Sequence, residues 1–130
     1  MPLLPKLLVL CEDAETRAAL EQSLGGCPVE RVYCTTRLAL REAVAAHAGD
    51  AVIYAEDHPG SKLRDLMEWP ELREARMPVI AVSRFGGMRD YLDAMEAGAF
   101  DYMARPLRGE EVSRIVESAV SRRRSRGQAA

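Results

Sequence analysis

The sequence predicts one α/β domain, in which a parallel β-sheet is covered by helices on both faces. Short apolar runs alternate with amphipathic segments five times along the 130 residues. Glycine or proline stands at most of the junctions between them. The strands read as continuous apolar runs, which is typical of strands buried on both faces. Strands that alternate with helices pair in parallel through right-handed crossovers.

Hydrophobic periodicity predicts five strands and five helices. The last helix has the clearest apolar stripe, at positions 112, 115, 116, 119 and 120. No internal repeat or linker interrupts the series, so the length fits one domain. In chain order we expect a strand at 7–10, a helix at 14–24, a strand at 32–34, a helix between Thr36 and Gly49, a strand at 51–55, a helix at 61–69, a strand at 79–82, a helix between Gly87 and Gly98, a strand at 100–103 and a helix at 108–122.

Residues with special backbone or hydrogen-bonding properties mark the expected helix ends. The glycine pair 25–26 is expected to end the first helix in the left-handed conformation. Thr35 or Thr36 can cap the second helix, and Ser61 can cap the third. Pro70 is expected to limit the third helix, because proline lacks the backbone N–H group that a helix interior needs.

Composition argues against several classes of protein. Hydrophobic residues make up 48% of the chain and charged residues 29%, which is ordinary for a globular domain and not for a disordered one. No apolar run approaches the ~18–20 residues that a membrane helix needs. The cysteines are odd in number and lack CxxC spacing, which favours reduced thiols in a cytoplasmic protein; they are Cys11, Cys27 and Cys34.

The charge is unevenly distributed. The sequence has 18 basic and 20 acidic residues, and four of the basic ones are arginines in the segment 122–126. The rest of the chain therefore has 14 basic against 20 acidic residues, a charge of −6. An acidic domain is a poor nucleic-acid binder. We divide the chain into a domain over 1–121 and a basic tail or linker over 122–130, and we expect nucleic acid to bind only through the tail or an output domain outside this sequence.

In a parallel α/β sheet the functional site lies at the carboxyl ends of the strands. None of the loops there is a glycine-rich phosphate loop, which argues against dinucleotide and P-loop functions. His47 and His58 are interpreted as a helix-end and a solvated loop histidine, without the partners that a catalytic triad needs. The loops to consider are 11–14, 55–60, 83–87 and 104–107.

Four residues in these loops have chemistry that suits a binding site. Glu12 and Asp13 could hold a hard cation such as Mg²⁺ or cap the helix that follows, and the spacing favours the cap. Ser83 could bind an anion or hydrogen-bond to the backbone. Arg105 could hold a phosphate or a carboxylate, or be a surface charge, and the proline after it raises the chance of a cis peptide bond.

Four segments together resemble the receiver domain of two-component response regulators. They are LVLCED at 8–13, DAVIYAEDHP at 50–59, PVIAVS at 78–83 and, most specific, AMEAGAFDYMARP at 94–106. The resemblance covers about residues 5–121. It implies a flavodoxin-like, doubly wound (βα)5 fold with five parallel strands in the order 2-1-3-4-5. It also implies phosphoryl transfer from a histidine kinase to an aspartate, with Mg²⁺ held by an acid pair and with a hydroxyl and a lysine on the phosphoryl oxygens.

The residues at the family's functional positions depart from this pattern. Ala55 stands where the resemblance implies the phosphorylated aspartate, and a methyl group cannot be phosphorylated. Cys11 replaces the first acid of the pair, and Arg105 replaces the lysine. Ser83 is retained, and Tyr102 falls at the aromatic position associated with switching. The resemblance therefore implies a degenerate receiver, whose vestigial pocket consists of Cys11, Glu12, Asp13, Ala55, Ser83 and Arg105.

Acids and a thiol near this pocket leave alternatives open. Glu12, Asp13 and Asp57 are the candidate ligands for Mg²⁺, and no other cofactor is expected. Asp57 is also the alternative phosphate acceptor, although the strand rise would displace it from the usual position by several ångströms. Cys11 could act as a thiol switch if Arg105 lowered its pKa; the alternative is a small buried hydrophobe.

We expect a phosphorylation-independent interaction module in signalling, without enzymatic activity; the alternative is a working receiver phosphorylated at Asp57. A histidine kinase or an output domain would be the partner, and a homodimer would use the face formed by 88–97, 100–104 and 108–121. A cytoplasmic location without membrane contact is expected. The face is expected to carry mixed charge at Arg89, Asp90, Asp93, Asp101, Arg108, Glu110, Glu111 and Arg114.

Overall fold

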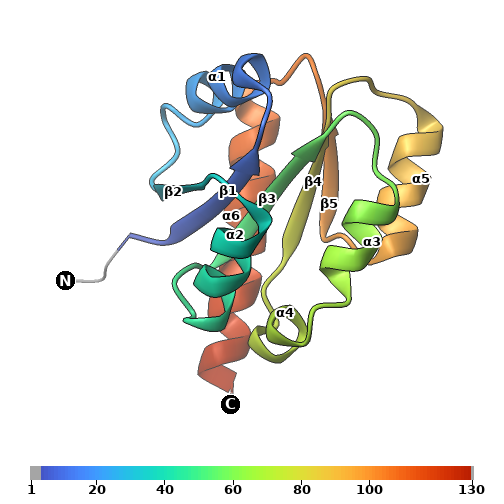
Figure 1. Cartoon of the computed structure of the whole chain (residues 1–130). Coiled ribbons are helices and arrows are strands. Elements are labelled where there is room, and N and C mark those ends of the chain that lie inside the picture. Colours follow the sequence, from blue (N-terminus) through green and yellow to red (C-terminus); the bar gives the residue numbers. More distant parts are fainter. Residues whose placement is uncertain (1–3, 130) are drawn as a thin grey trace.

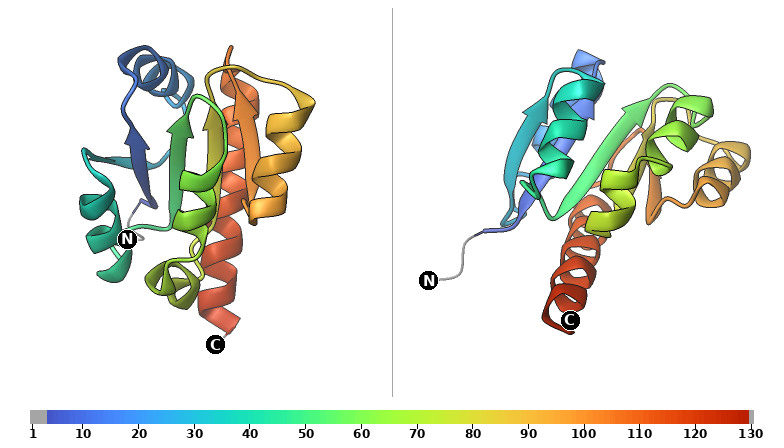
Figure 2. Two further views of the ribbon diagram at one scale, coloured as in Figure 1. Left: turned by 45° about the vertical axis from the view of Figure 1, so that its right-hand side comes forward. Right: turned by 60° about the horizontal axis from the view of Figure 1, so that its bottom comes forward.

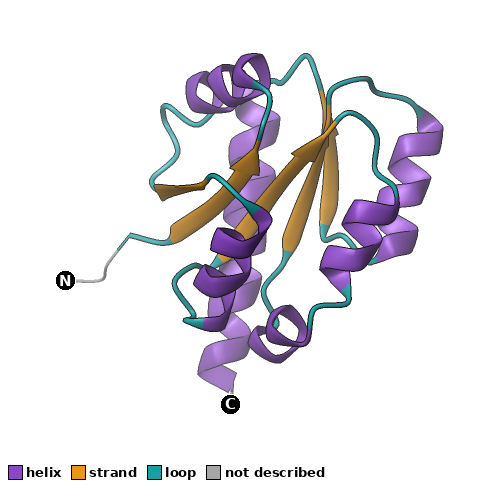
Figure 3. Cartoon of the chain, in the orientation of Figure 1, coloured by secondary structure: helices purple, strands orange, loops and turns teal. Residues whose placement is uncertain are grey.

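Five parallel strands form one sheet in the order β2-β1-β3-β4-β5 (Figures 1 and 3), as the sequence predicts. The computed structural model describes residues 4–129, and side chains over 4–124. The strands are β1 (Lys6–Cys11), β2 (Glu30–Cys34), β3 (Ala51–Glu56), β4 (Val79–Ser83) and β5 (Asp101–Ala104). The helices are α1 (Ala14–Ser23), α2 (Arg37–Ala45), α3 (Ser61–Met67), α4 (Pro70–Ala75), α5 (Met88–Ala97) and α6 (Gly109–Ala129).

Helices cover both faces of the sheet. α1 and α6 lie on one face, and α2, α3, α4 and α5 lie on the other (Figures 1 and 2). Successive side chains of β1 point to opposite faces, so that Leu8 and Leu10 pack towards α2 while Leu7 and Val9 pack towards α1 and α6. All four are buried, which is why this run lacks the alternation of a strand with one exposed face.

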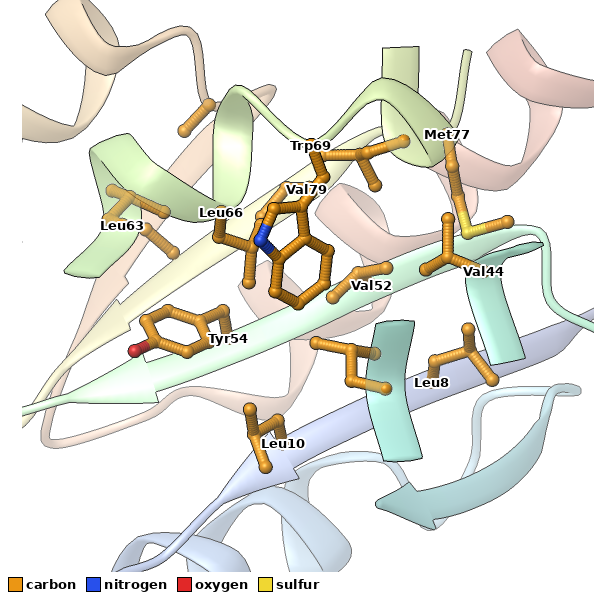
Figure 4. Close-up of a cluster of buried hydrophobic side chains, with 14 of the residues drawn as sticks. Leu8, Leu10, Val44, Val52, Tyr54, Leu63, Leu66, Trp69, Met77 and Val79 are labelled. Atoms are coloured by element: carbon orange, nitrogen blue, oxygen red, sulfur yellow. The ribbon is translucent and has the colours of Figure 1, made fainter. Parts of the chain in front are cut away.

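The core below α2, α3 and α4 contains the only tryptophan of the chain. The ring of Trp69 lies among side chains from α3 and β3, with Leu66 and Val52 close to it (Figure 4). Arg41 of α2 lies over the Trp69 ring and forms a salt bridge with Glu71 of α4 at 2.7 Å. These contacts fix α4 against α2 at the edge of the sheet.

Some predicted helix ends are confirmed and others are wrong. Thr36 caps α2, because its side chain accepts a hydrogen bond at 3.0 Å from the N–H group three residues on. Ser61 does not cap α3: it is the first helical residue, and Gly60 precedes it without a side-chain cap. The glycine pair 25–26 does not take the left-handed conformation, because α1 already ends in a tight right-handed turn at Leu24.

Two helical segments differ from the prediction. Pro70 begins α4 instead of only limiting α3, because the N–H group that proline lacks has no partner at the first position of a helix. α6 continues to Ala129 through the arginines, which are good helix formers. The proposed boundary after residue 121 is therefore not marked by a helix end, and it stays a prediction. Within the described part of the chain, no helix has the length and apolar character needed to cross a membrane.

Candidate functional site

A cleft of about 520 Å³ opens at the carboxyl ends of β1 and β3, at the end of the sheet to which the strand arrowheads point (Figure 1). The β1–α1 loop, the β3–α3 loop and the start of α2 form its walls. The position agrees with the predicted site at the carboxyl edge of a parallel sheet. Its lining residues are Leu10, Glu12, Asp13, Thr16, Arg37, Tyr54, Ala55, Glu56, Asp57, His58, Gly60, Ser61, Lys62 and Arg84.

Ala55 lies in the floor of this cleft. It is half-buried near the end of β3, where it pairs in register with Cys11 of β1 and Val82 of β4. The cleft floor therefore has a methyl group at position 55, and both residues that pair with Ala55 in the sheet are also uncharged. Asp57 follows two residues later, its side chain 63% exposed, with an oxygen 4.0 Å from Arg84.

Asp13 is engaged as a helix cap. Its side chain accepts hydrogen bonds from the backbone N–H group of Thr16, at 3.1 Å, and from the Thr16 hydroxyl. The hydroxyl hydrogen bond is the main reason why the pKa of Asp13 lies below its ordinary value. The interpretation of Asp13 as a cap is confirmed. Glu12 beside it is exposed and lines the cleft.

Arg105, at the end of the β5 strand, lies against carboxylates of this same chain. Its Nη1 atom is 3.7 Å from Oδ2 of Asp13 and 3.6 Å from Oε2 of Glu15. The peptide bond between Arg105 and Pro106 is cis. The cation at this corner of the sheet is thus partly neutralised by the first turn of α1.

Ser83 is fully buried at the end of β4 and makes three close contacts through its hydroxyl. The Oγ atom lies 2.9 Å from the carbonyl oxygen of Asp57, 3.1 Å from that of Phe85 and 3.0 Å from Oδ2 of Asp90. A single hydroxyl proton can be donated to only one of these acceptors at a time. Asp90 also lies 2.9 Å from Nδ1 of His58. Ser83 is therefore held by the β3–α3 loop and the first turn of α5 together.

The sequence and the fold are similar to those of response regulators, although no family model matches the chain. It is 24% identical over 115 residues to the response regulator protein PilR of Pseudomonas aeruginosa, covering 88% of this chain and 26% of that protein. It is 26% identical over 113 residues to the DNA-binding transcriptional regulator NtrC of Escherichia coli, covering 87% of this chain and 24% of that protein.

Solved structures show a similar fold. The signal receiver domain of a LuxO repressor protein from Vibrio parahaemolyticus superposes with a TM-score of 0.80 at 15% identity, over 98% of both chains. A response regulator from Thermotoga maritima superposes with a TM-score of 0.75 at 20% identity, over 92% of this chain and 99% of that one. The chain has the receiver-domain fold, and its sequence is similar to those of response regulators. It spans about a quarter of the length of the curated relatives that it matches.

Cys11 is half-buried at the end of β1. The Sγ atom lies 3.3 Å from the carbonyl oxygen of Asp13, and burial raises the pKa of the Cys11 thiol above its ordinary value. The thiol-switch hypothesis requires the opposite shift, from a nearby Arg105. That arginine lies against Asp13 and Glu15 instead, so the contacts favour the alternative, a small hydrophobic residue, over the thiol switch.

The contacts among Ser83, Asp90 and His58 correct two further sequence-based interpretations. His58 is not simply a solvated loop histidine, because its ring contacts Asp90 and stacks on Phe85 with 5.4 Å between the ring centres. Asp90 does not belong to an exposed charged face, because it is only 7% exposed. The contacts between His58 and Asp90 join residues 32 positions apart, which no local sequence signal reveals.

Tyr102 of β5, the predicted switch aromatic, is half-buried. Its ring meets that of Tyr91 edge-on, with 6.0 Å between ring centres. Its hydroxyl is buried near Ser83 and Asp90 but has no hydrogen-bond partner of good geometry within the described part of the chain. Burial raises the pKa of Tyr102 above its ordinary value.

Of the predicted pocket residues, Glu12, Asp13 and Ala55 line the cleft, while Cys11, Ser83 and Arg105 lie around it without lining it.

Sequence reasoning missed a linked set of side chains on the other side of Ala55. Arg37 donates to the Tyr54 hydroxyl at 2.9 Å, and that hydroxyl lies 3.4 Å from Oε2 of Glu56. Burial is the main reason why the pKa of Tyr54 rises to about 12 and why that of Glu56 is raised.

Among the described residues, no group of three or more histidine, cysteine or acidic side chains is placed to hold a metal ion. The candidate ligands Glu12, Asp13 and Asp57 are therefore not gathered into one such group.

Proposed function

We propose that this receiver domain is a phosphorylation-independent interaction module of two-component signalling. The observation that carries the proposal is Ala55 in the cleft floor, paired with Cys11 and Val82. Phosphoryl transfer needs a nucleophile held in line with the leaving group, and an alanine side chain offers none. The resemblance to response regulators supports a signalling role and not an enzymatic one.

The contacts around Ala55 support the same proposal. Arg105, at the position of the phosphate-binding lysine, lies within 3.7 Å of two carboxylates of the chain itself. Ser83, at the position of the phosphate-binding hydroxyl, is buried among two carbonyl oxygens and Asp90. These side chains are satisfied without a phosphoryl group, since each already has partners within the domain.

Exposure to a phosphoryl donor tests the proposal. The domain is incubated with acetyl phosphate and Mg²⁺, and its intact mass is measured. We expect no increase by one phosphoryl group. An Asp57→Ala variant treated in parallel identifies the alternative, because Asp57 lines the same cleft. A phosphorylated wild-type domain that loses its adduct in Asp57→Ala would replace our proposal with a receiver that uses a displaced acceptor.

The partner surface that we propose is formed by α5, β5 and α6. The chain matches only about a quarter of the length of the curated relatives, and the NtrC proteins among them are DNA-binding transcriptional regulators. We therefore propose that a histidine kinase, an output domain or a second copy of the chain binds this surface in the cytoplasm. Nucleic acid would be contacted only through residues 122–130 or through an output domain. The α5 part of the surface exposes three large apolar side chains, at Met88, Tyr91 and Leu92.

A further inference from the structure

A second cleft, of about 510 Å³, lies at the opposite end of the sheet, at the amino ends of β4 and β5. α4 and the last described turns of α6 approach each other there, at the lower end of the domain in Figures 1 and 2. None of its lining residues takes part in the Ala55 cleft. They are Met67, Leu72, Arg73, Arg76, Met77, Pro78, Val79, Met95, Gly98, Ala99, Phe100, Arg122 and Arg123.

The inner wall of this arginine-lined cleft is apolar. Leu72 and Met77 are buried, and Met67, Met95 and Phe100 are half-buried. Three of these five are methionines, whose unbranched and polarizable side chains adapt to different apolar shapes. A volume of about 510 Å³ with an apolar wall is within the range of small-molecule sites.

The charged side chains that line this cleft are all positive. Four arginines contribute to it, two from the α4 region and two from α6, and none of the described lining residues is acidic; the arginines are Arg73, Arg76, Arg122 and Arg123. Glu71 on the same short helix is engaged by Arg41 at 2.7 Å. Four guanidinium groups around one cleft repel each other unless an anion lies between them.

Two of the arginines show how the cleft would receive a ligand. The Nε atom of Arg123 is buried and has no hydrogen-bond partner among the described side chains, so one donor at the cleft is unsatisfied there. The Arg122 guanidinium lies over the Phe100 ring, 5.5 Å from its centre, which places a cation directly beside the apolar wall. Guanidinium groups bind carboxylates and phosphates through two parallel hydrogen bonds.

We propose that the arginine-lined cleft binds a small amphipathic anion, in which an aliphatic or aromatic body carries one carboxylate or phosphate group. The apolar body packs against Met67, Met77 and Phe100, and the anionic group accepts from the arginines. This proposal is independent of the proposed function, because the cleft shares no residue with the Ala55 site. It gives the domain a ligand-binding site at the end of the sheet that the phosphorylation chemistry of receivers does not use.

Octanoate is the probe, and 1-octanol and inorganic phosphate are its matched controls. Amide chemical shifts of the ¹⁵N-labelled domain are followed during each titration. We expect saturable shifts at 76, 77, 95 and 98–100 with octanoate, at least about ten-fold weaker binding of 1-octanol, and no saturation at these residues with phosphate. Equal binding of octanoate and 1-octanol, or octanoate shifts confined to the Ala55 cleft, would overturn the proposal.

Arginine variants test the anionic half of the site. Arg76 has a left-handed backbone with φ of 53°, a conformation that asparagine tolerates, so Arg76→Asn is expected to fold. We expect this variant and Arg122→Gln each to bind octanoate about ten-fold more weakly than wild type. Arg89→Asn, at a side chain 89% exposed on α5 outside the cleft, is the control and should bind as wild type does. Unchanged affinity in both cleft variants would contradict the assignment.

Discussion

The hydroxyl oxygen of Ser83 lies 3.0 Å from Oδ2 of Asp90, and both residues are buried. This contact ties the end of β4 to the first turn of α5, where the negative charge also faces the positive end of the helix dipole. His58, from the β3–α3 loop, contacts the same carboxylate oxygen at 2.9 Å. One carboxylate thus joins three segments at the carboxyl edge of the sheet.

Replacing Asp90 should therefore destabilise the domain. Asp90→Ala removes an acceptor from Ser83 and His58, and we expect the free energy of unfolding to fall by about 1–3 kcal/mol. Urea denaturation followed by circular dichroism measures the change. Asp93→Ala is the control, because Asp93 lies on the same helix and forms an ion pair at 3.7 Å with Arg89, whose side chain is 89% exposed. Its effect should stay within about 0.5 kcal/mol, and an equal loss in both variants would contradict the role given to Asp90.

Burial of Glu56 predicts a pH dependence of stability. The folded state raises the pKa of Glu56 above the value of 4.5 typical of the unfolded chain, so the folded domain holds this proton more tightly. The contribution of Glu56 to the free energy of unfolding should fall as the pH rises from about 4 to about 7. Glu56→Gln lacks this titration. The stability of the variant relative to wild type should therefore increase over this range, as measured by urea denaturation at several pH values. A relative gain by wild type would contradict this assignment.

Replacing Ala55 with an acidic residue should make the stability of the domain depend on Mg²⁺. Ala55→Asp places a carboxylate in the cleft that already contains Glu12, Glu56 and Asp57, and the added repulsion should lower the melting temperature in EDTA. Because Mg²⁺ prefers carboxylate oxygens and stabilises the state that binds it, Mg²⁺ should raise the melting temperature of the variant.

Two controls accompany this melting experiment. Ala55→Asn has nearly the same shape as the aspartate variant but no charge, so it should show neither the loss in EDTA nor the recovery. The melting temperature of wild type should not change between EDTA and Mg²⁺. A Mg²⁺ response of wild type equal to that of Ala55→Asp would show that the cleft acids bind the metal without residue 55.

The strand order was expected from the resemblance to receiver domains, and several local features were predicted from residues close together in the chain. The helix caps at Asp13 and Thr36 are examples, since a side-chain oxygen bonds to an N–H group three residues later. The sheet edge was predicted because parallel strands bring their carboxyl ends together. This rule places a residue at the edge of the sheet, but it does not predict which other side chain that residue contacts.

The features that the sequence did not reveal depend on contacts between distant segments. Arg105 finds its partners in α1, about 90 residues earlier, and Asp90 meets His58 32 residues earlier. Each of these side chains could equally have faced solvent without any change in hydrophobic pattern. The short helix α4 was missed for a different reason. Proline can follow the end of one helix and can also be the first residue of the next, and Pro70 was interpreted only in the first way.

Gly49 shows how a glycine can be fixed by packing and not by backbone freedom. A Cβ atom at this position would lie 2.5 Å from Cγ of Leu8, which is fully buried in β1. We expect Gly49→Ala to lower the free energy of unfolding by about 1–3 kcal/mol through overpacking. Gly26→Ala is a matched control, because a Cβ atom there meets nothing within 4 Å. Chemical denaturation should show Gly26→Ala unchanged or slightly more stable, and equal losses in the two variants would contradict the packing explanation.

The apolar residues on α5 predict where copies of the chain, or a partner, would meet. Leu92 is 53% exposed, and Met88 and Tyr91 lie beside it on the same helix, whereas Leu38 is 66% exposed on α2, on another part of the surface. If the α5 face mediates self-association, sedimentation velocity should show a concentration-dependent dimer that Leu92→Asp abolishes and Leu38→Asp preserves. Both variants should keep the stability of wild type, because neither side chain belongs to the core. Loss of the dimer in Leu38→Asp alone would move the interface to α2, and a monomeric wild-type domain would leave the α5 face to a partner of a different sequence.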